Sequence, residues 1–268
     1  ITVDGDSSDW TGIPPVSINT YTRSMFEWIW KDNSGDERTD FASPDTRVDL
    51  TEFRITADEN YVYFMAEMSD IDLGTGDGAP MVQVSVDNDR ISGSGESWLG
   101  GLADTQVDIN AEWERLIKTR FGSGSGVVAV YDTGWVDIAT AQDIESISTI
   151  NDVIEFRVGW NTLGVSPPAP LRFTVSTYRA TLGDDTWDIG GVSDALDVIT
   201  TVAGNTWNEV SDGVINYYFD IYLPLENAYF EKECMPDLGQ HSDNWCWVAA
   251  AANSFWWYAQ HGYPVLID

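Results

Sequence analysis

Six short segments rich in β-branched and aromatic residues constrain the fold of this chain more than any other sequence feature. They occupy residues 61–68, 81–86, 126–131, 153–158, 171–178 and 215–222. Apolar and polar residues alternate in the last two, which is typical of strands with one buried face. Turns rich in Gly, Asp, Asn, Ser and Pro separate the segments, at residues 58–60, 74–78, 122–126 and 166–168. The pattern predicts a mainly β fold, an antiparallel β-sandwich. For residues 108–120 a short helix and a further strand both remain open.

The composition indicates a folded, strongly acidic protein. Its 268 residues include 44 Asp and Glu against 13 Lys and Arg, a formal net charge of -31, together with 13 Trp and 11 Tyr. Disordered acidic tails lack such aromatic residues. The negative charge excludes nucleic-acid and electrostatic membrane binding, and no apolar run is long enough for a membrane span. Divalent cations are the natural partners, although a halophilic or heat-adapted surface would explain the acidity equally well.

Cysteine and histidine are confined to the C-terminal part of the chain, as Cys234, His241, Cys246 and His261. Any chemistry in residues 1–225 must therefore use carboxylates, hydroxyls and aromatic rings. We expect three parts: a β-sandwich binding module at 1–225, a linker at 226–239 and a helical segment at 240–268. The last contains four consecutive alanines among Trp, Phe and Val, which predicts one apolar helix that is buried on several sides.

Two acidic loops that contain glycine are candidate Ca²⁺ sites. Their carboxylates are Asp32, Asp36 and Asp40 in the first loop, and Asp70, Asp72 and Asp77 in the second. Ca²⁺ takes six to eight oxygen ligands, and such loops offer both carboxylates and free backbone carbonyls. Neither loop has the spacing of an EF-hand. The alternative is that these side chains form Asx turns at the ends of strands.

Several tryptophans lie near expected loops or strand ends, where an exposed ring could stack on the face of a sugar. These candidates are Trp28, Trp98, Trp113, Trp135, Trp187 and Trp207. For each of them packing in the core or at its rim is the alternative. A catalytic pair for glycoside hydrolysis cannot be selected among 44 carboxylates.

Three motifs, taken in their order, resemble secreted sandwich modules. Residues 3–10 (VDGDSSDW), and residues 70–78 (DIDLGTGDG) with the strand ending at Asp87, resemble family 9 carbohydrate-binding modules and DOMON domains. Residues 193–197 (SDALD) resemble the end of the related module at the C-terminus of archaeal pullulanases and glucodextranases. The resemblance spans residues 1–222. It implies a calcium-stabilised, jelly-roll-like sandwich that accompanies an extracellular enzyme.

Residues 240–247 (QHSDNWCW) resemble the N-terminal active-site segment of papain-like cysteine peptidases. The resemblance implies that Cys246 is a nucleophile at a helix N-terminus and that Gln240 donates to the oxyanion. In that family the general-base histidine lies far downstream, whereas His261 follows Cys246 by a helical distance of about 20 Å. We therefore expect an incomplete, inactive peptidase segment. The alternative is a disulfide between Cys234 and Cys246, which would silence the thiol.

Together these features predict an extracellular or cell-surface, calcium-stabilised binding or adhesion module fused to a peptidase-like segment. Its ligand would be a glycan or a peptide, and a longer parent protein could be an active peptidase. The alternative is a structural subunit of a surface layer, sheath or filament, in which the C-terminal helix docks into a neighbouring chain of a homo-oligomer. Because the chain starts at Ile1, we also expect a trimmed product of a longer secreted precursor.

Overall fold

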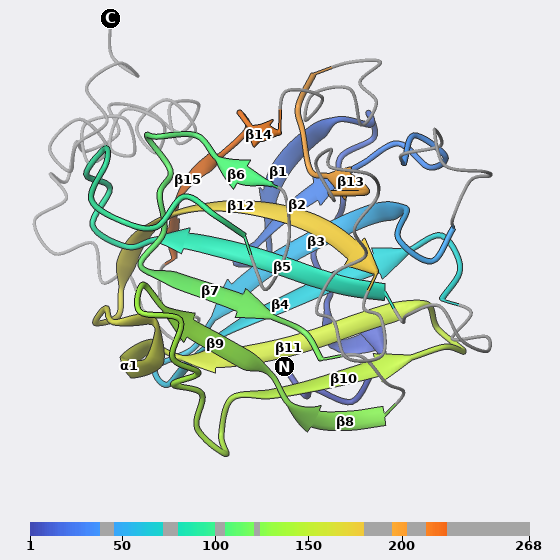
Figure 1. The fold of residues 1–268 in the computed structure, drawn as a ribbon. Coiled ribbons are helices and arrows are strands. Elements are labelled where there is room, and N and C mark those ends of the chain that lie inside the picture. The colour runs from blue at the N-terminus through green and yellow to red at the C-terminus, as the bar shows by residue number, and fades with distance from the viewer. Residues whose placement is uncertain are drawn as a thin grey trace, which may run out of the picture. The chain divides into compact units, whose positions relative to one another are not determined.

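The computed structural model describes residues 1–37, 46–71, 80–99, 105–120, 124–179, 195–202 and 213–223. The chain divides into two units, Ile1–Glu226 and Asn227–Asp268, and all described residues belong to the first. This part is mainly β (Figure 1). Its described helical segments are a single 3₁₀ turn, η1 (Ser7–Asp9), and a short helix, α1 (Trp160–Leu163).

The larger sheet has seven strands, and all of its neighbouring strands are antiparallel. In spatial order they are β1 (Thr20–Ser24), β2 (Glu27–Lys31), β3 (Leu50–Ala57), β4 (Tyr61–Met68), β11 (Val153–Gly159), β10 (Ile144–Ser148) and β8 (Gly124–Val127). The central strands β3, β4 and β11 are buried on both faces. Their polar side chains therefore need partners inside the protein.

The smaller sheet is also antiparallel and is built around β12. In spatial order its strands are β13 (Asp197–Val198), β12 (Ala169–Arg179), β5 (Pro80–Asp87), β7 (Arg115–Lys118) and β9 (Ala129–Asp132), with β15 (Phe219–Leu223) also paired to β12. Two further strands, β6 (Gln106–Val107) and β14 (Val214–Ile215), form one short parallel pair.

One hydrophobic core joins the two sheets, which pack face to face. Phe53 and Phe64 of the larger sheet belong to the same buried cluster as Val84 and Phe173 of the smaller sheet. The ring of Trp30 meets that of Phe173 edge-on, with centroids 5.3 Å apart. In Figure 1, β5 and β12 accordingly cross in front of β3 and β4. Burial of these aromatic rings together with the aliphatic side chains of the same cluster stabilises the contact between the sheets.

The N-terminal segment covers the outer face of the larger sheet. Trp10 packs with Tyr63 and Met65 of β4 in a separate buried cluster. Its indole nitrogen donates to Glu155 on β11 at 2.6 Å, and the backbone amide of Gly5 donates to the same carboxylate at 2.7 Å. This cover explains why β4 and β11 are buried on both faces.

The prediction of a mainly β, antiparallel fold is confirmed, but two expected strands are divided. Residues 126–131 split at Val128, since β8 and β9 belong to different sheets, and residues 215–222 split between β14 and β15. Residues 108–120 contain the strand β7 (Arg115–Lys118) and no helix. The expected C-terminal helix lies outside the described residues. No helix in the described part of the chain is long and apolar enough to cross a membrane.

Candidate metal centre

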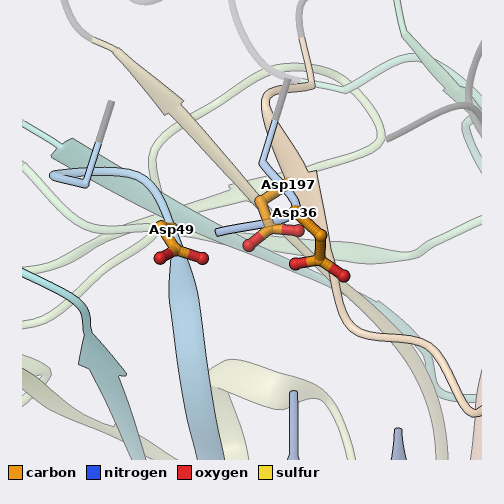
Figure 2. A group of neighbouring side chains, drawn as sticks. All are labelled: Asp36, Asp49 and Asp197. Atoms are coloured by element: carbon orange, nitrogen blue, oxygen red, sulfur yellow. The ribbon is translucent and has the colours of Figure 1, made fainter. Parts of the chain in front are cut away.

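Three carboxylates converge where β3 of the larger sheet lies next to β13, an edge strand of the smaller sheet. Asp36 follows β2, Asp49 lies directly before β3, and Asp197 opens β13. One oxygen from each lies within 4.8 Å of the others. Figure 2 shows Asp36 and Asp197 side by side, with Asp49 across from them. We call this group the Asp197 cluster.

Hydrogen bonds fix the orientation of Asp49. The amide of Gly35 donates to both of its carboxylate oxygens, at 3.0 and 2.9 Å, and the hydroxyls of Ser34 and Ser69 donate to Oδ2. Gly35 has a φ of +84°, a conformation that favours glycine. Ser34 and Gly35 come from the first predicted acidic loop, and Ser69 directly precedes the second. Asp49 is therefore held by the first loop and by the residue at the entry to the second.

Asp197 links the two sheets. Its Oδ2 accepts a hydrogen bond of 2.7 Å from the amide of Leu50 in β3, and its Oδ1 accepts one of 2.8 Å from Val198. Its own strand is paired to β12 at Thr177. The pKa of Asp197 is raised well above its ordinary value, first by burial and then by the charges of neighbouring carboxylates, Asp32, Asp36 and Asp49 among them.

Some of the carboxylate oxygens here are buried without a hydrogen-bond donor among the described residues. They are Oδ1 of Asp36 and both oxygens of the adjacent Glu37, whose side chains are only 8% and 1% exposed. Burial, followed by the charges of Asp49 and Glu37, raises the pKa of Asp36 to about 6. Burial and Asp49 also raise the pKa of Glu37. A buried anionic oxygen without a donor is costly unless a proton or a cation compensates it.

The geometry of the Asp197 cluster suits one hard cation. Two unit charges about 4 Å apart repel by about 4 kcal/mol at an effective dielectric constant of about 20, so three ionised carboxylates need compensation. Ca²⁺ binds oxygens at about 2.4 Å, which places ligands on opposite sides of the ion about 4.8 Å apart. The oxygens of Asp36, Asp49 and Asp197 lie within that limit. Because the three residues offer only oxygens, they favour Ca²⁺ over the softer metals that select thiolate or imidazole.

The structure brings together only part of the predicted Ca²⁺ ligand set. Asp36 belongs to the Asp197 cluster, and Asp32 is buried and close enough to raise the pKa of Asp197. Asp70 is exposed and does not belong to the cluster. The remaining predicted ligands, Asp40, Asp72 and Asp77, lie outside the described residues.

Two members of the cluster, Asp49 and Asp197, were not predicted as ligands. The sequence signals were that Asp197 ends the 193–197 motif and that Asp49 directly precedes a strand. Neither signal distinguishes a ligand from an acid that caps a strand.

The predicted stacking residues have different environments. Trp113 is completely buried, so its ring cannot stack on a ligand at the surface. Trp98 and Trp135 are 46% and 39% exposed. Trp28 is partly buried and donates to the carbonyl of Tyr222 at 3.1 Å. The other named candidates lie outside the described residues, namely Trp187, Trp207, Cys234, Gln240 and Cys246.

Comparison with known proteins does not add a family to this geometry. No protein-family model matches the sequence, and no curated protein matches it significantly. The resemblances to carbohydrate-binding and DOMON-like modules and to papain-like peptidases therefore stay predictions.

Proposed function

We propose that residues 1–223 form a Ca²⁺-stabilised, jelly-roll-like β-sandwich that acts outside the cell as a binding module. The observation that carries the calcium assignment is the Asp197 cluster. Its three oxygens lie within 4.8 Å of one another, and buried oxygens of Asp36 and Glu37 beside them find no donor in the part of the chain that the structure describes. The acidic composition supports the same assignment, since a surface of this charge favours cations.

The proposed ion stabilises the contact between the two sheets. Asp49 precedes β3 of the larger sheet, whereas Asp197 lies on β13 of the smaller sheet. An ion bound to both would hold the β3 end of one layer against the edge of the other. Such an ion binds only the folded chain, because the ligands are separated by long stretches of sequence, and it therefore shifts the folding equilibrium toward the native state.

Direct binding of Ca²⁺ tests this proposal. Calorimetric titration of the chelator-treated protein at pH 7.5 should show a tight site, which Asp36→Asn weakens by at least about tenfold because one ligand charge is lost. Glu59→Gln removes the same charge at an exposed turn and should leave the titration unchanged. Unaltered tight binding in Asp36→Asn, or no tight binding in the parent protein, would reject the calcium site.

The ligand-binding surface that we propose lies at Trp98 and Trp135. Trp135 has a φ of +59°, an uncommon conformation for a bulky residue. Its ring stands edge-on against that of Trp113, with the two ring centroids 5.2 Å apart, and the ring of Tyr131 lies 6.2 Å from it. The buried ring of Trp113 thus supports an exposed one, and Trp113 also donates to the carbonyl of Trp98 at 2.9 Å. A supported, exposed indole suits the apolar face of a sugar ring.

Retention on insoluble polysaccharides, compared by affinity electrophoresis across a panel of glycans, tests this ligand class. For any glycan that retards the parent protein, Trp135→Ala should weaken binding by about tenfold, because buried aromatic anchors dominate such contacts. Tyr222→Ala removes an aromatic ring of similar exposure (43%) from β15 and serves as the control. Equal loss in both variants, or no retardation of the parent protein by any glycan, would count against this surface.

The rest of the functional prediction concerns residues outside the described part of the chain. We propose, on the sequence resemblance alone, that residues 240–268 are an incomplete cysteine-peptidase segment. The alternative, a structural subunit of a surface layer, sheath or filament, depends on the same segment and stays a prediction as well.

A further inference from the structure

A second group of carboxylates lies at the opposite end of the smaller sheet. Asp87 ends β5, Asp89 follows it in the next turn, and Glu114 directly precedes β7. One oxygen from each lies within 4.8 Å of the others. We call this group the Asp87 cluster. None of its members was predicted from the sequence as a ligand.

The carboxylate of Asp87 has a buried oxygen without a hydrogen bond. The residue is 1% exposed; its Oδ1 accepts from the amide of Arg90 at 2.5 Å, whereas Oδ2 has no hydrogen-bond donor within the described ranges. The guanidinium of Arg172 approaches Oδ2 only to 3.8 Å. That guanidinium is already engaged in two 2.9 Å hydrogen bonds to Asp220 and in one to the carbonyl of Asn110. Oδ2 is therefore an anionic acceptor, and the N–H groups of the nearby guanidinium donate to other oxygens.

The charge balance around this oxygen is negative. Burial, together with the charges of Asp89 and Asp220, raises the pKa of Asp87, although Arg172 lowers it. Burial and the charges of Asp89 and Asp87 likewise raise the pKa of Glu114. Arg172 contacts two of these carboxylates, Asp220 directly and Asp87 at 3.8 Å. A divalent cation among Asp87, Asp89 and Glu114 would relieve this repulsion and supply Oδ2 with a partner.

We propose that Asp87, Asp89 and Glu114 bind a second Ca²⁺ ion. This site is weaker than the Asp197 cluster for two reasons. Asp89 is exposed and Glu114 only partly buried, so that water competes for the ion, and Arg172 opposes a cation electrostatically. Solvent molecules complete the coordination at the exposed side, as is usual where a protein supplies fewer than six oxygens.

The two sites are far enough apart to bind independently. Strand β12 pairs with Asp87 at Arg172 and with Asp197 at Thr177. Five residues of strand correspond to about 17 Å, well beyond the distance at which ligands are shared. Loss of one site should therefore leave the affinity of the other unchanged.

Calorimetric titration with CaCl₂ of three chelator-treated proteins, the parent chain, Asp89→Asn and Asp36→Asn, tests the second site. The parent should bind two ions in a tight and a weaker class. Asp89→Asn should weaken only the weaker class, by at least about tenfold, and the variant keeps an amide oxygen that can cap the amide of Ile91 as Asp89 does at 2.8 Å. Asp36→Asn should affect only the tight class. A parent protein that binds one ion, lost in Asp89→Asn but kept in Asp36→Asn, would support the second site and reject the first.

The Arg172→Gln substitution should change the calcium affinity of this site in the opposite direction. Removing the competing guanidinium should strengthen the weaker class by about tenfold, whereas a purely structural carboxylate cluster predicts no gain of binding. Melting curves of each variant show whether it is folded. A titration of Asp89→Asn that coincides with that of the parent protein, or a parent protein whose only calcium class is lost in Asp36→Asn, would overturn the proposal.

Discussion

Removal of Ca²⁺ by a chelator should lower the melting temperature of the protein by about 5–10 °C. A ligand at about a hundredfold excess over its Kd stabilises the native state by about 2.7 kcal/mol. A chain of this size gains about 2–4 °C per kcal/mol. The effect is large because the ion in the Asp197 cluster would connect β3 of one sheet to β13 of the other. Thermal unfolding followed by circular dichroism, with excess Ca²⁺ and with EDTA, measures it.

The variant Asp36→Asn distinguishes a metal site from a structural carboxylate cluster. In EDTA it should melt at or above the temperature of the parent protein, because it removes a repelling charge next to Asp49 and Glu37. In excess Ca²⁺ it should melt below the parent, because a ligand is missing. Glu59→Gln, the exposed charge control, should respond to Ca²⁺ as the parent does. Equal destabilisation of Asp36→Asn in both buffers would show that Asp36 has only a structural role.

The second large effect that we expect is a loss of this calcium stabilisation in acid. The increase in melting temperature on adding Ca²⁺ should be largest at pH 7–8 and should vanish near pH 4.5. Protons and Ca²⁺ compete for the same carboxylates, and Asp36 has its pKa raised from 3.8 to about 6. Melting curves recorded every half pH unit, with and without Ca²⁺, measure the dependence. A calcium effect that is the same at pH 4.5 and pH 7.5 would contradict it.

The sign of the pH dependence without Ca²⁺ follows from the raised pKa. Between pH 3.8 and about 6 the folded protein holds a proton on Asp36 that the unfolded chain has released. The free energy of unfolding should therefore fall as the pH rises through this range. Glu145 on β10, whose pKa burial raises to about 7, acts in the same direction. Its contribution is common to both buffers, so the difference between them reports on the proposed calcium sites.

Three of the strands that the sequence predicts are buried on both of their faces. Residues 61–68, 81–86 and 153–158 are nearly continuous apolar or β-branched runs, and they coincide with β4, β5 and β11. Strand β3 was not predicted, although residues 52–57 alternate polar and apolar. Its polar positions are buried too: Arg54 pairs with Glu27 at 2.8 Å and with Glu52 at 2.5 Å. Such charges can lie inside the protein because they are paired there, and the pairing is visible only in the folded structure.

The candidate site was predictable only where its residues are local in sequence. Asp36 stands out because it lies in an acidic loop that contains glycine. Asp49 precedes β3 and Asp197 opens β13, two strands that lie close together only when the sheets pack, where the amide of Leu50 donates to Asp197. Periodicity determines which face of a strand is buried, but it does not indicate which strand ends lie side by side.

Anomalous X-ray scattering from crystals grown with CaCl₂ tests the calcium assignment most directly. Data collected near the calcium absorption edge should show a strong peak within about 2.3–2.6 Å of carboxylate oxygens of Asp36, Asp49 and Asp197. The Asp36→Asn variant, crystallised in the same solution, should show a much weaker peak there. A parent crystal with no anomalous peak at these three residues, and with the carboxylates in direct contact through shared protons, would contradict the account.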